Sequence, residues 1–167
     1  MQLPKLILTD IDGVWTDGSM YYSSDGAEFK RFNTFDSFGV LLARKAGIPV
    51  GIITGEDTEM VERRSKKLKL EFLVQGSSDK VADATEICKQ LGIQLSDVAY
   101  IGDDIGDYKL LQACGISGAP SNAAEFVKQE VDYVTSLGGG SGAFRDFVEY
   151  IFKEVGVYDK YLDQLKQ

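Results

Sequence analysis

The sequence of 167 residues contains no histidine and only two cysteines. The absence of histidine removes the usual general base, the most frequent metal ligand and every catalytic triad that uses histidine. Acid–base chemistry must therefore come from carboxylates, lysine, tyrosine or a metal-bound water. Cys88 and Cys114 lack CxxC spacing, which favours two reduced core residues over a disulfide or a nucleophile.

Positive charge is also scarce. Lysine and arginine number 18 against 26 aspartates and glutamates, for a formal net charge of −8. A surface for nucleic acid or for an anionic membrane needs a basic face, so we expect neither partner. A few local cations would still suffice for an anionic small molecule. No signal peptide and no apolar run of about 18 residues is present, which predicts a soluble, cytoplasmic protein.

The remaining composition, with 44% hydrophobic and 26% charged residues, is typical of a globular domain. Strand-like apolar segments alternate with helix-like segments, which predicts an α/β fold with a doubly wound, mostly parallel sheet. No repeat, low-complexity tract or linker is present. We therefore expect one domain over residues 1–167.

An apolar run beginning at Leu6 ends in Asp10-Ile11-Asp12-Gly13. Such a run predicts a buried strand of a parallel sheet, which delivers its last side chains to the edge where α/β folds bind ligands. Gly13 allows the chain to turn there. Two carboxylates at one edge repel each other, so a divalent cation held by oxygen ligands is their natural partner.

Three later segments add polar side chains after predicted strands: Thr54, Lys80, and the acidic cluster from Asp103 to Asp107. Right-handed crossovers bring the carboxyl ends of parallel strands to one edge, so these groups can converge on the first acidic pair. Lys80 lies in the first turn of a predicted helix, where a cation opposes the helix dipole. That mismatch favours a functional role for Lys80.

This set of residues predicts phosphoryl transfer. Asp10 is placed to attack phosphorus and form an aspartyl-phosphate. Asp12 can protonate the leaving oxygen and then deprotonate the attacking water. Asp10 and Asp103 would hold Mg²⁺, which neutralises the developing charge. Thr54 would donate a hydrogen bond to the phosphoryl group, and Lys80 would supply fixed positive charge.

A β-hairpin is predicted at about residues 19–32, where aromatic residues flank Asp25-Gly26. It would stand at the same edge of the sheet as a lid or a subunit contact. Further local expectations are Leu41 on the buried face of a helix, Asp57 as a helix cap, a turn at Gly118–Pro120, and a tail over Tyr158–Gln167 that packs against the domain.

The four segments match, in order, the motifs of the haloacid dehalogenase superfamily: a DxD motif at residues 10–12, a threonine at 54, a lysine at 80 and a GDxxxD motif at 102–107. The resemblance covers nearly the whole chain. It implies an Asp10 nucleophile, an Asp12 general acid/base, and Mg²⁺ bound by Asp10, Asp103 and the backbone carbonyl of Asp12.

Longer motifs resemble the capless branch of that superfamily, which contains the 3-deoxy-octulosonate 8-phosphate phosphatases. They are DxDGxxTDG at 10–18, TG at 54–55, QGxxDK at 75–80, GDDxxD at 102–107 and GGxGA at 139–143. In this branch a neighbouring subunit closes the open site, so the resemblance implies a homotetramer.

One position departs from the octulosonate enzymes, which typically carry arginine after Thr-Gly, whereas this chain has Glu56. In this respect the chain most closely resembles phosphatases of 2-keto-3-deoxy-nononate (KDN) 9-phosphate. We therefore expect KDN 9-phosphate as the substrate, within sialic-acid-type sugar biosynthesis, followed by N-acetylneuraminate 9-phosphate and octulosonate 8-phosphate. Arg64 or Lys67, from this chain or a neighbour, would meet the substrate carboxylate.

By resemblance, the expected site comprises the catalytic residues Asp10 and Asp12; the metal ligands Asp10, Asp12 and Asp103; the substrate-binding residues Asp12, Asn33, Thr34, Thr54, Gly55, Glu56, Arg64, Lys67 and Lys80; and the supporting residues Asp104 and Asp107.

Three other functions stay open at this point. A signalling receiver domain also has acidic residues, a threonine and a lysine at a sheet edge, but its phosphoacceptor lies apart from the acidic pair. A non-catalytic oligomer could organise a sugar-nucleotide synthetase. An open, capless site could also act on phosphoproteins.

Overall fold

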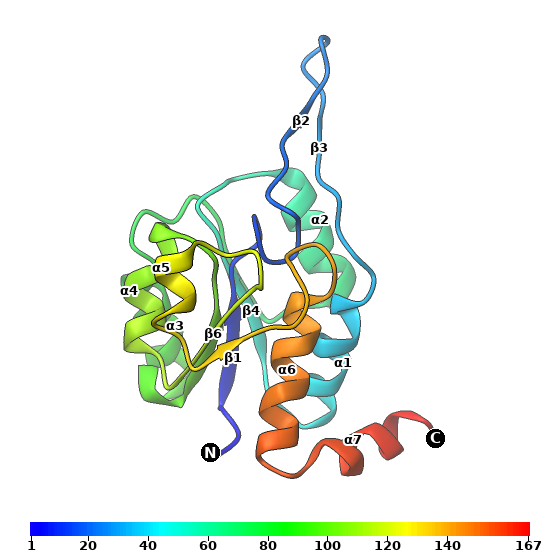
Figure 1. Ribbon diagram of the computed structural model, residues 1–167, viewed down its shortest axis with the longest axis vertical. Coiled ribbons are helices and arrows are strands. Elements are labelled where there is room, and N and C mark those ends of the chain that lie inside the picture. The colour runs from blue at the N-terminus through cyan, green and yellow to red at the C-terminus, as the bar shows by residue number, and fades with distance from the viewer.

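The computed structural model describes residues 1–167 and contains a six-stranded sheet between two layers of helices (Figure 1). The sheet strands are β1 (Leu6–Thr9), β4 (Val50–Ile53), β5 (Phe72–Val74), β6 (Val98–Ile101), β7 (Ile116–Ala119) and β8 (Tyr133–Val134). Their order is β5-β4-β1-β6-β7-β8, and all neighbours are parallel. The predicted α/β fold with a parallel sheet is confirmed.

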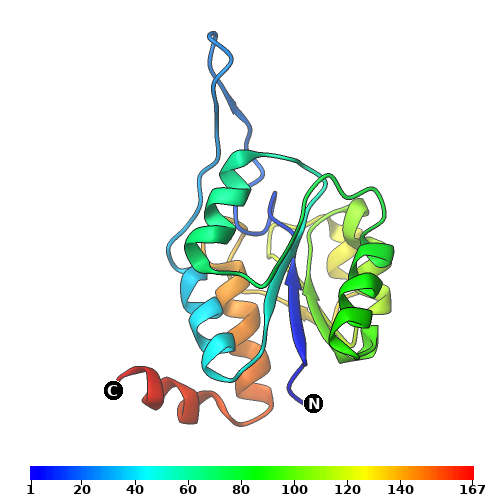
Figure 2. The ribbon, with the colours of Figure 1, turned by 180° about the vertical axis from the view of Figure 1, so that it is seen from behind.

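The helices cover both faces of the sheet, as Figure 2 shows from behind. They are α1 (Asp36–Lys45), α2 (Glu59–Leu68), α3 (Lys80–Leu91), α4 (Ile105–Ala113), α5 (Glu125–Lys128), α6 (Ala143–Glu154) and α7 (Tyr158–Leu165), with a 3₁₀ turn at Leu95–Asp97. Helices α1, α2, α6 and α7 lie on one face, and α3, α4 and α5 lie on the other. None of them has the length and apolar character that a membrane span requires.

The central strands β1 and β6 are buried along their whole length, because helices cover both of their faces. One core cluster lies between the sheet and α1, α2 and α6, and it contains Trp15, Phe144 and Phe147, all without exposed surface. The second lies between the sheet and α3, α4 and α5 and contains Tyr100. Burial on both faces explains why these strands read as continuous apolar runs.

The chain order reverses between β1 and β6. From β1 the chain builds β4 and β5 on one side, and it then crosses back to place β6 on the other side of β1. The loops that leave such a pair of strands diverge at their carboxyl ends and open a crevice there. Asp10 follows β1 and Asp103 follows β6, so both acidic segments flank this crevice.

The hairpin is formed by β2 (Tyr21–Tyr22) and β3 (Glu28–Phe29), with Tyr21 paired to Phe29. It projects beyond the carboxyl edge of the sheet, away from the body of the domain (Figure 1). Tyr22 is 68% exposed and Phe29 is 60% exposed. This position is the one predicted for the hairpin.

Three local expectations were wrong. The predicted turn at Gly118–Pro120 is largely strand β7, which ends at Ala119. The cap of α2 is Thr58, whose side chain accepts a hydrogen bond from the Val61 amide, rather than Asp57. Leu41 is 46% exposed, because α1 turns Gly39, Val40, Leu42 and Ala43 inward instead. For strand β7 and for Leu41, tertiary packing, which local patterns do not contain, decided the outcome. The cap of α2 is a local contact that the adjacent threonine makes instead of the aspartate.

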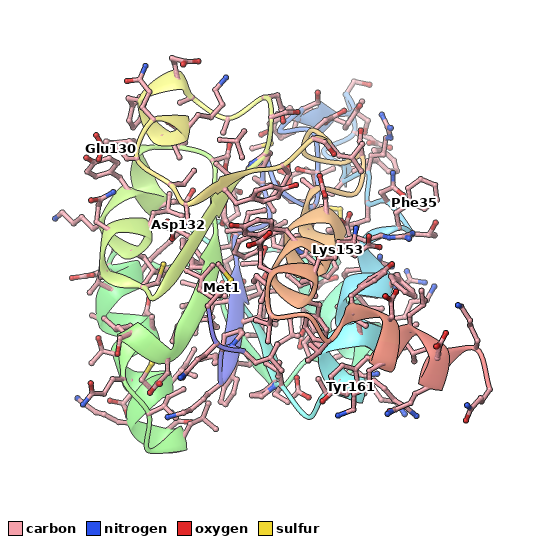
Figure 3. All side chains as sticks on the ribbon, turned by 60° about the horizontal axis from the view of Figure 1, so that its bottom comes forward. Met1, Phe35, Glu130, Asp132, Lys153 and Tyr161 are labelled. Carbon is pink, nitrogen blue, oxygen red and sulfur yellow. The ribbon has the colours of Figure 1, made fainter.

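The tail forms α7, which packs against α1 and α6 at the amino end of the sheet. Tyr161 meets the ring of Phe152 edge-on at 5.7 Å between centroids, and Figure 3 shows Tyr161 from this end of the molecule. The tail therefore covers the core at the end opposite to the hairpin.

We expect Gly118→Ala to destabilise the fold. A Cβ at Gly118 would lie 2.5 Å from the buried ring of Phe147, so the core would be overpacked at a cost of about 1–3 kcal/mol in unfolding free energy. Urea unfolding measures this change. Gly106→Ala is the matched control, since nothing lies within 4 Å of its Cβ, and it should be neutral or stabilising. A neutral Gly118→Ala would contradict the close contact.

Candidate active site

A tight turn after β1 shapes the first side of the site. The amides of Val14, Trp15 and Thr16 all donate to the carbonyl oxygen of Ile11. Gly13 adopts φ +96°, and its missing Cβ leaves room for Asp103, whose Oδ2 would lie 2.0 Å from a Cβ there. The turn therefore ends β1 at the cavity, and both Asp10 and Asp12 line it.

That cavity has a volume of about 450 Å³ at the carboxyl edge of the sheet, and none of its 13 lining residues is hydrophobic. The lining residues are Asp10, Asp12, Gly18, Thr54, Gly55, Glu56, Ser77, Ser78, Lys80, Asp103, Asp104, Gly106 and Asp107. A wholly polar lining suits a polar, hydroxylated or ionic ligand.

Lys80 lies between two carboxylates at the floor of this cavity. Its Nζ is 2.8 Å from Asp10 Oδ1 and 2.6 Å from Asp107 Oδ1. Its side chain is only 9% exposed. Asp79 caps α3 by accepting from the amides of Val81 and Ala82, which fixes the start of the helix and directs Lys80 into the site.

Asp107 is fully used by hydrogen bonds. Its Oδ1 accepts from Lys80 and from the buried Tyr100 hydroxyl, and its Oδ2 accepts from the amides of Asp103 (2.9 Å) and Asp104 (3.2 Å). The last contacts hold the loop after β6, and Asp104 caps α4. Asp107 thus orients Lys80 and Asp103, and it has no oxygen left for a metal.

Burial and mutual repulsion raise the pKa values of the other two carboxyl groups, Asp10 and Asp103. The pKa of Asp10 rises to about 7, chiefly through burial and then through the charge of Asp107, against the opposing effect of Lys80. The pKa of Asp103 rises to about 8 through burial and the charges of Asp10, Asp107 and Asp104. These groups hold protons near neutral pH until a cation displaces them.

The donor set fits a divalent cation. Carboxylate oxygens of Asp10, Asp103 and Asp107 lie within 4.8 Å of one another, and Lys80 is the cation beside Asp10 and Asp107. Because Asp107 is saturated by donors, Asp10 and Asp103 are the two side chains that can ligate. Oxygen ligands of this kind suit Mg²⁺.

Asp12 has a partner that sequence reasoning missed. Its Oδ1 lies 2.5 Å from Nζ of Lys30, which follows β3 of the hairpin, and 3.4 Å from Thr16 Oγ1. The only sequence signal was the position of the hairpin at the same sheet edge. Tyr100 was missed as well, because a tyrosine within an apolar strand reads as core.

The other predicted residues divide between two places. Thr54 is buried and lines the cavity with the exposed Gly55 and Glu56. Arg64 and Lys67 instead line a separate cavity of about 230 Å³, together with Lys30, Phe32, Met60 and Arg63. Four of its six lining residues are cations, and none is a carboxylate.

Arg64 and Asn33 hold the structure beside the site. Arg64 donates to the Asn33 carbonyl and to Ser37 Oγ, both at 3.0 Å, and its guanidinium stacks over Trp15. Asn33 donates to the Gly140 carbonyl at 3.0 Å. Asn33 and the exposed Thr34 do not line the cavity that contains Asp10.

The glycine-rich loop at residues 138–142 closes the back of the site. A Cβ at Gly139 would lie 1.8 Å from the Gly13 carbonyl oxygen, so only glycine allows this approach. The Gly139 amide donates to Asn122 Oδ1 at 2.8 Å. The GGxGA motif therefore supports the turn after β1.

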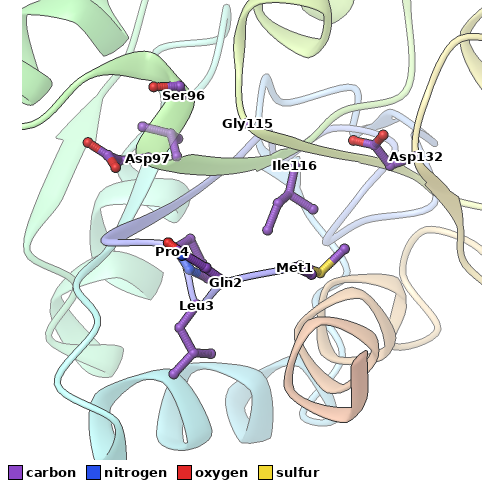
Figure 4. A pocket seen from close by; sticks show the side chains of 10 residues that line it. Met1, Gln2, Leu3, Pro4, Ser96, Asp97, Gly115, Ile116 and Asp132 are labelled. Carbon is purple, nitrogen blue, oxygen red and sulfur yellow. The ribbon is translucent and has the colours of Figure 1, made fainter. Parts of the chain in front are cut away.

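A second large cavity, of about 390 Å³, lies at the amino edge of the sheet under residues 1–4 (Figure 4). Its carboxylates already have partners: Asp97 pairs with Lys5, and Asp132 accepts from the amide and hydroxyl of Ser117. No cluster of reactive groups comparable to the carboxyl edge is present there.

Comparisons with known proteins identify the family of this chain. A family model described as haloacid dehalogenase-like hydrolase matches residues 64–139. The 3-deoxy-D-manno-octulosonate 8-phosphate phosphatase of Haemophilus influenzae is 36% identical over 91% of this chain and 84% of its own. The chain belongs to the haloacid dehalogenase-like hydrolases.

Solved structures of such phosphatases match more than nine-tenths of the chain. The octulosonate 8-phosphate phosphatase of Moraxella catarrhalis, in complex with a magnesium ion, a phosphate ion and a KDO molecule, has a TM-score of 0.92 and 37% identity, covering 97% of this chain and 93% of that one. The cobalt-bound enzyme of Haemophilus influenzae has a TM-score of 0.88 and 35% identity, covering 93% and 91%.

These relatives correct one expectation. They act on octulosonate 8-phosphate, so they do not support the view that KDN 9-phosphate phosphatases are the nearest group or that the chain serves sialic-acid synthesis. The expectation of KDN 9-phosphate rested on Glu56 alone, whereas similarity along nine-tenths of the chain favours octulosonate 8-phosphate.

We expect the metal-free hydrolase to lose stability as pH rises. Asp10 and Asp103 have pKa values of about 7 and about 8 in the folded chain, against the ordinary value of 3.8 in the unfolded chain. Between about pH 4 and pH 8 the folded state therefore binds more protons than the unfolded state, and raising the pH favours unfolding. Urea unfolding in a chelator should give an unfolding free energy lower by about 2 kcal/mol or more at about pH 8.5 than at about pH 5.5.

Asp103→Asn is the control for this measurement. It should remove a large part of the pH slope, while Asp36, whose pKa burial raises to about 6, keeps its own share. An unchanged slope in the variant would show that the site does not cause it.

Proposed function

We propose that this hydrolase is a Mg²⁺-dependent phosphatase of a 2-keto-3-deoxy sugar acid phosphate, with octulosonate 8-phosphate as the first candidate. The observation that carries the proposal is the gathering of Asp10, Asp12, Asp103 and Lys80 in one cavity without a hydrophobic residue. The octulosonate 8-phosphate phosphatases among its relatives, which align over nine-tenths of the chain, support the substrate class.

In this mechanism Asp10 is the nucleophile. Its carboxylate attacks phosphorus, the P–O bond to the sugar breaks, and an aspartyl-phosphate forms. Lys80, 2.8 Å from Asp10, keeps the carboxylate in place and offers positive charge to the phosphoryl oxygens. Thr54 lines the same cavity and would donate its hydroxyl hydrogen to one of these oxygens.

Asp12 moves the protons. It gives a proton to the departing sugar oxygen, and it then takes one from the water that hydrolyses the aspartyl-phosphate. Its Oδ2 is buried without a partner, so it is free for this exchange. A carboxyl group fills the role that histidine plays in many other hydrolases.

Asp10 and Asp103 would hold Mg²⁺, with the Asp12 backbone carbonyl as a further ligand. The ion would supply positive charge that offsets the repulsion between the carboxylate nucleophile and the phosphate. The magnesium-bound and cobalt-bound structures of the relatives support this cofactor.

KDN 9-phosphate is the second candidate, because Glu56 lines the cavity. A carboxylate there would repel a substrate carboxylate, but it could accept hydrogen bonds from the hydroxyl groups of a longer sugar chain. The substrate carboxylate would then lie in the basic cavity of Arg64 and Lys67. Nononate specificity rests on this arrangement alone.

The first test is phosphate release from three substrates with Mg²⁺: octulosonate 8-phosphate, KDN 9-phosphate and N-acetylneuraminate 9-phosphate. We expect kcat/KM to favour octulosonate 8-phosphate by about tenfold, which is roughly 1.4 kcal/mol in transition-state binding. The Asp10→Asn variant should release no phosphate from any of them.

Glu56→Arg tests the second candidate in the same assay. A preference for KDN 9-phosphate that disappears in Glu56→Arg would transfer the assignment to the nononate. No turnover of any of the three esters by the wild-type protein would reject the substrate class.

We also propose that the hydrolase works as a homotetramer in which a neighbour covers the open cavity. The exposed apolar side chains of the hairpin, Met20, Tyr22 and Phe29, support a subunit contact, because an isolated monomer gains nothing from exposing them. The hairpin projects from the edge that carries the cavity, so a chain packed on it would lie above the site.

Sedimentation velocity tests the assembly. The wild-type protein should sediment as four chains at micromolar concentration. In a Tyr22→Ser, Phe29→Ser double variant the Kd of the assembly should rise by at least about tenfold. Phe126→Ser, an exposed aromatic side chain on α5, is the matched control and should leave the assembly intact. A wild-type monomer would overturn the proposal.

A further inference from the structure

Lys30 is a buried cation on an otherwise exposed hairpin. Glu28 and Phe29 just before it are exposed, yet the Lys30 side chain is only 5% exposed. Burial of an ammonium group is unfavourable unless a partner compensates for the lost hydration. Lys30 has one such partner, Asp12, whose Oδ1 lies 2.5 Å from its Nζ.

Charge around Lys30 directs it toward Asp12. On its other side Lys30 lines the basic cavity with Arg63, Arg64 and Lys67. Like charges on that side disfavour an approach of the ammonium group, and no carboxylate lines that cavity. The Asp12 carboxylate is therefore the one anion available to Lys30.

The contact with Lys30 makes the two carboxylate oxygens of Asp12 different from each other. Oδ1 accepts from Lys30 and, at 3.4 Å, from Thr16 Oγ1. Oδ2 is buried and has no partner. A buried polar atom without a partner needs an explanation, and a catalytic role is one such explanation. With Oδ1 held, the rotation of the carboxyl group is fixed and Oδ2 alone is free to exchange a proton.

We propose that Lys30 is a positioning residue for the general acid/base. It fixes Asp12 through Oδ1, so that Oδ2 carries the proton to the leaving oxygen, and it joins the hairpin to the chemical step. This inference rests on the proposed phosphatase function. Lys30 contacts neither the reacting atoms nor the metal ligands Asp10 and Asp103 in this arrangement.

The test uses leaving groups that differ in their need for a proton. A sugar alkoxide must be protonated as it departs, whereas p-nitrophenolate leaves without help. For both esters kcat/KM reports the steps up to loss of the leaving group. We expect Lys30→Met to lower kcat/KM about tenfold or more for octulosonate 8-phosphate, through kcat, and less than about threefold for p-nitrophenyl phosphate.

Two further variants separate positioning from support of the fold. Lys30→Arg keeps the charge and should restore most of the activity. In an Asp12→Asn background, Lys30→Met should have no further effect, because the group that it positions is already lost. Circular dichroism verifies that each variant is folded.

Arg31→Met is the matched control. Arg31 is the next residue, also a cation, and it pairs with Asp17 at 3.5 Å with 63% of its side chain exposed. Its loss should leave kcat/KM for both esters unchanged.

An equal loss with both esters, or an added loss in the Asp12→Asn background, would overturn the role of Lys30 and leave the phosphatase function standing. Wild-type protein that hydrolyses neither ester would instead overturn the proposed function, and the role of Lys30 with it.

Discussion

The arrangement of the active edge depends on one buried cation. Asp10, Asp103 and Asp107 bring three carboxyl groups together at one edge of the sheet, and Lys80 is the only side chain that forms ion pairs with two of them. The same ammonium group fixes Asp107, which in turn holds the amides of the loop after β6. Its position follows from the Asp79 cap at the start of α3. The position of Lys80 therefore depends on a local helix cap, and its ion pairs join segments that are far apart in the sequence.

The cavity at Asp10 and the neighbouring basic cavity differ in the charge of their lining residues. One is lined by carboxylates, hydroxyl groups and a single lysine, and the other by cations with two apolar residues. A phosphorylated sugar acid carries a phosphate at one end and a carboxylate at the other. Such a molecule matches the pair of cavities better than a phosphoprotein substrate would. A receiver domain or a non-catalytic scaffold would have no use for two cavities of opposite charge.

Much of this site could be predicted from the sequence, because its main residues follow strands directly. Asp10, Thr54 and Asp103 each follow a buried apolar run, and the carboxyl ends of parallel strands meet at one edge. The alternation of strand-like and helix-like segments predicted the parallel sheet, and the aromatic residues around Asp25-Gly26 predicted the hairpin. These predictions needed no knowledge of how individual side chains pack.

The rest depends on contacts that sequence patterns do not contain. Lys30 reaches Asp12 because the chain returns to the edge of the sheet after β3, and the Tyr100 hydroxyl donates to Asp107 from within an apolar strand. Strand β7 was missed because Gly118, which reads as a turn, is needed to fit against Phe147. Arg64 was expected only to meet the substrate carboxylate, and no sequence pattern indicated that it also stacks over Trp15 and donates to the Asn33 carbonyl.

The pairing of β1 with β6 has a consequence for how the chain folds. Asp10 and Asp103 come from opposite halves of the sequence, and they meet only after the crossover that places β6 beside β1. Contacts between residues so far apart form late, since a long loop must close first. A divalent cation held by both carboxylates would bind the folded chain but not the unfolded chain, and it would therefore stabilise the contact between the two halves of the sheet. Recovery of activity during refolding would then report the last large closure of the chain rather than its early collapse.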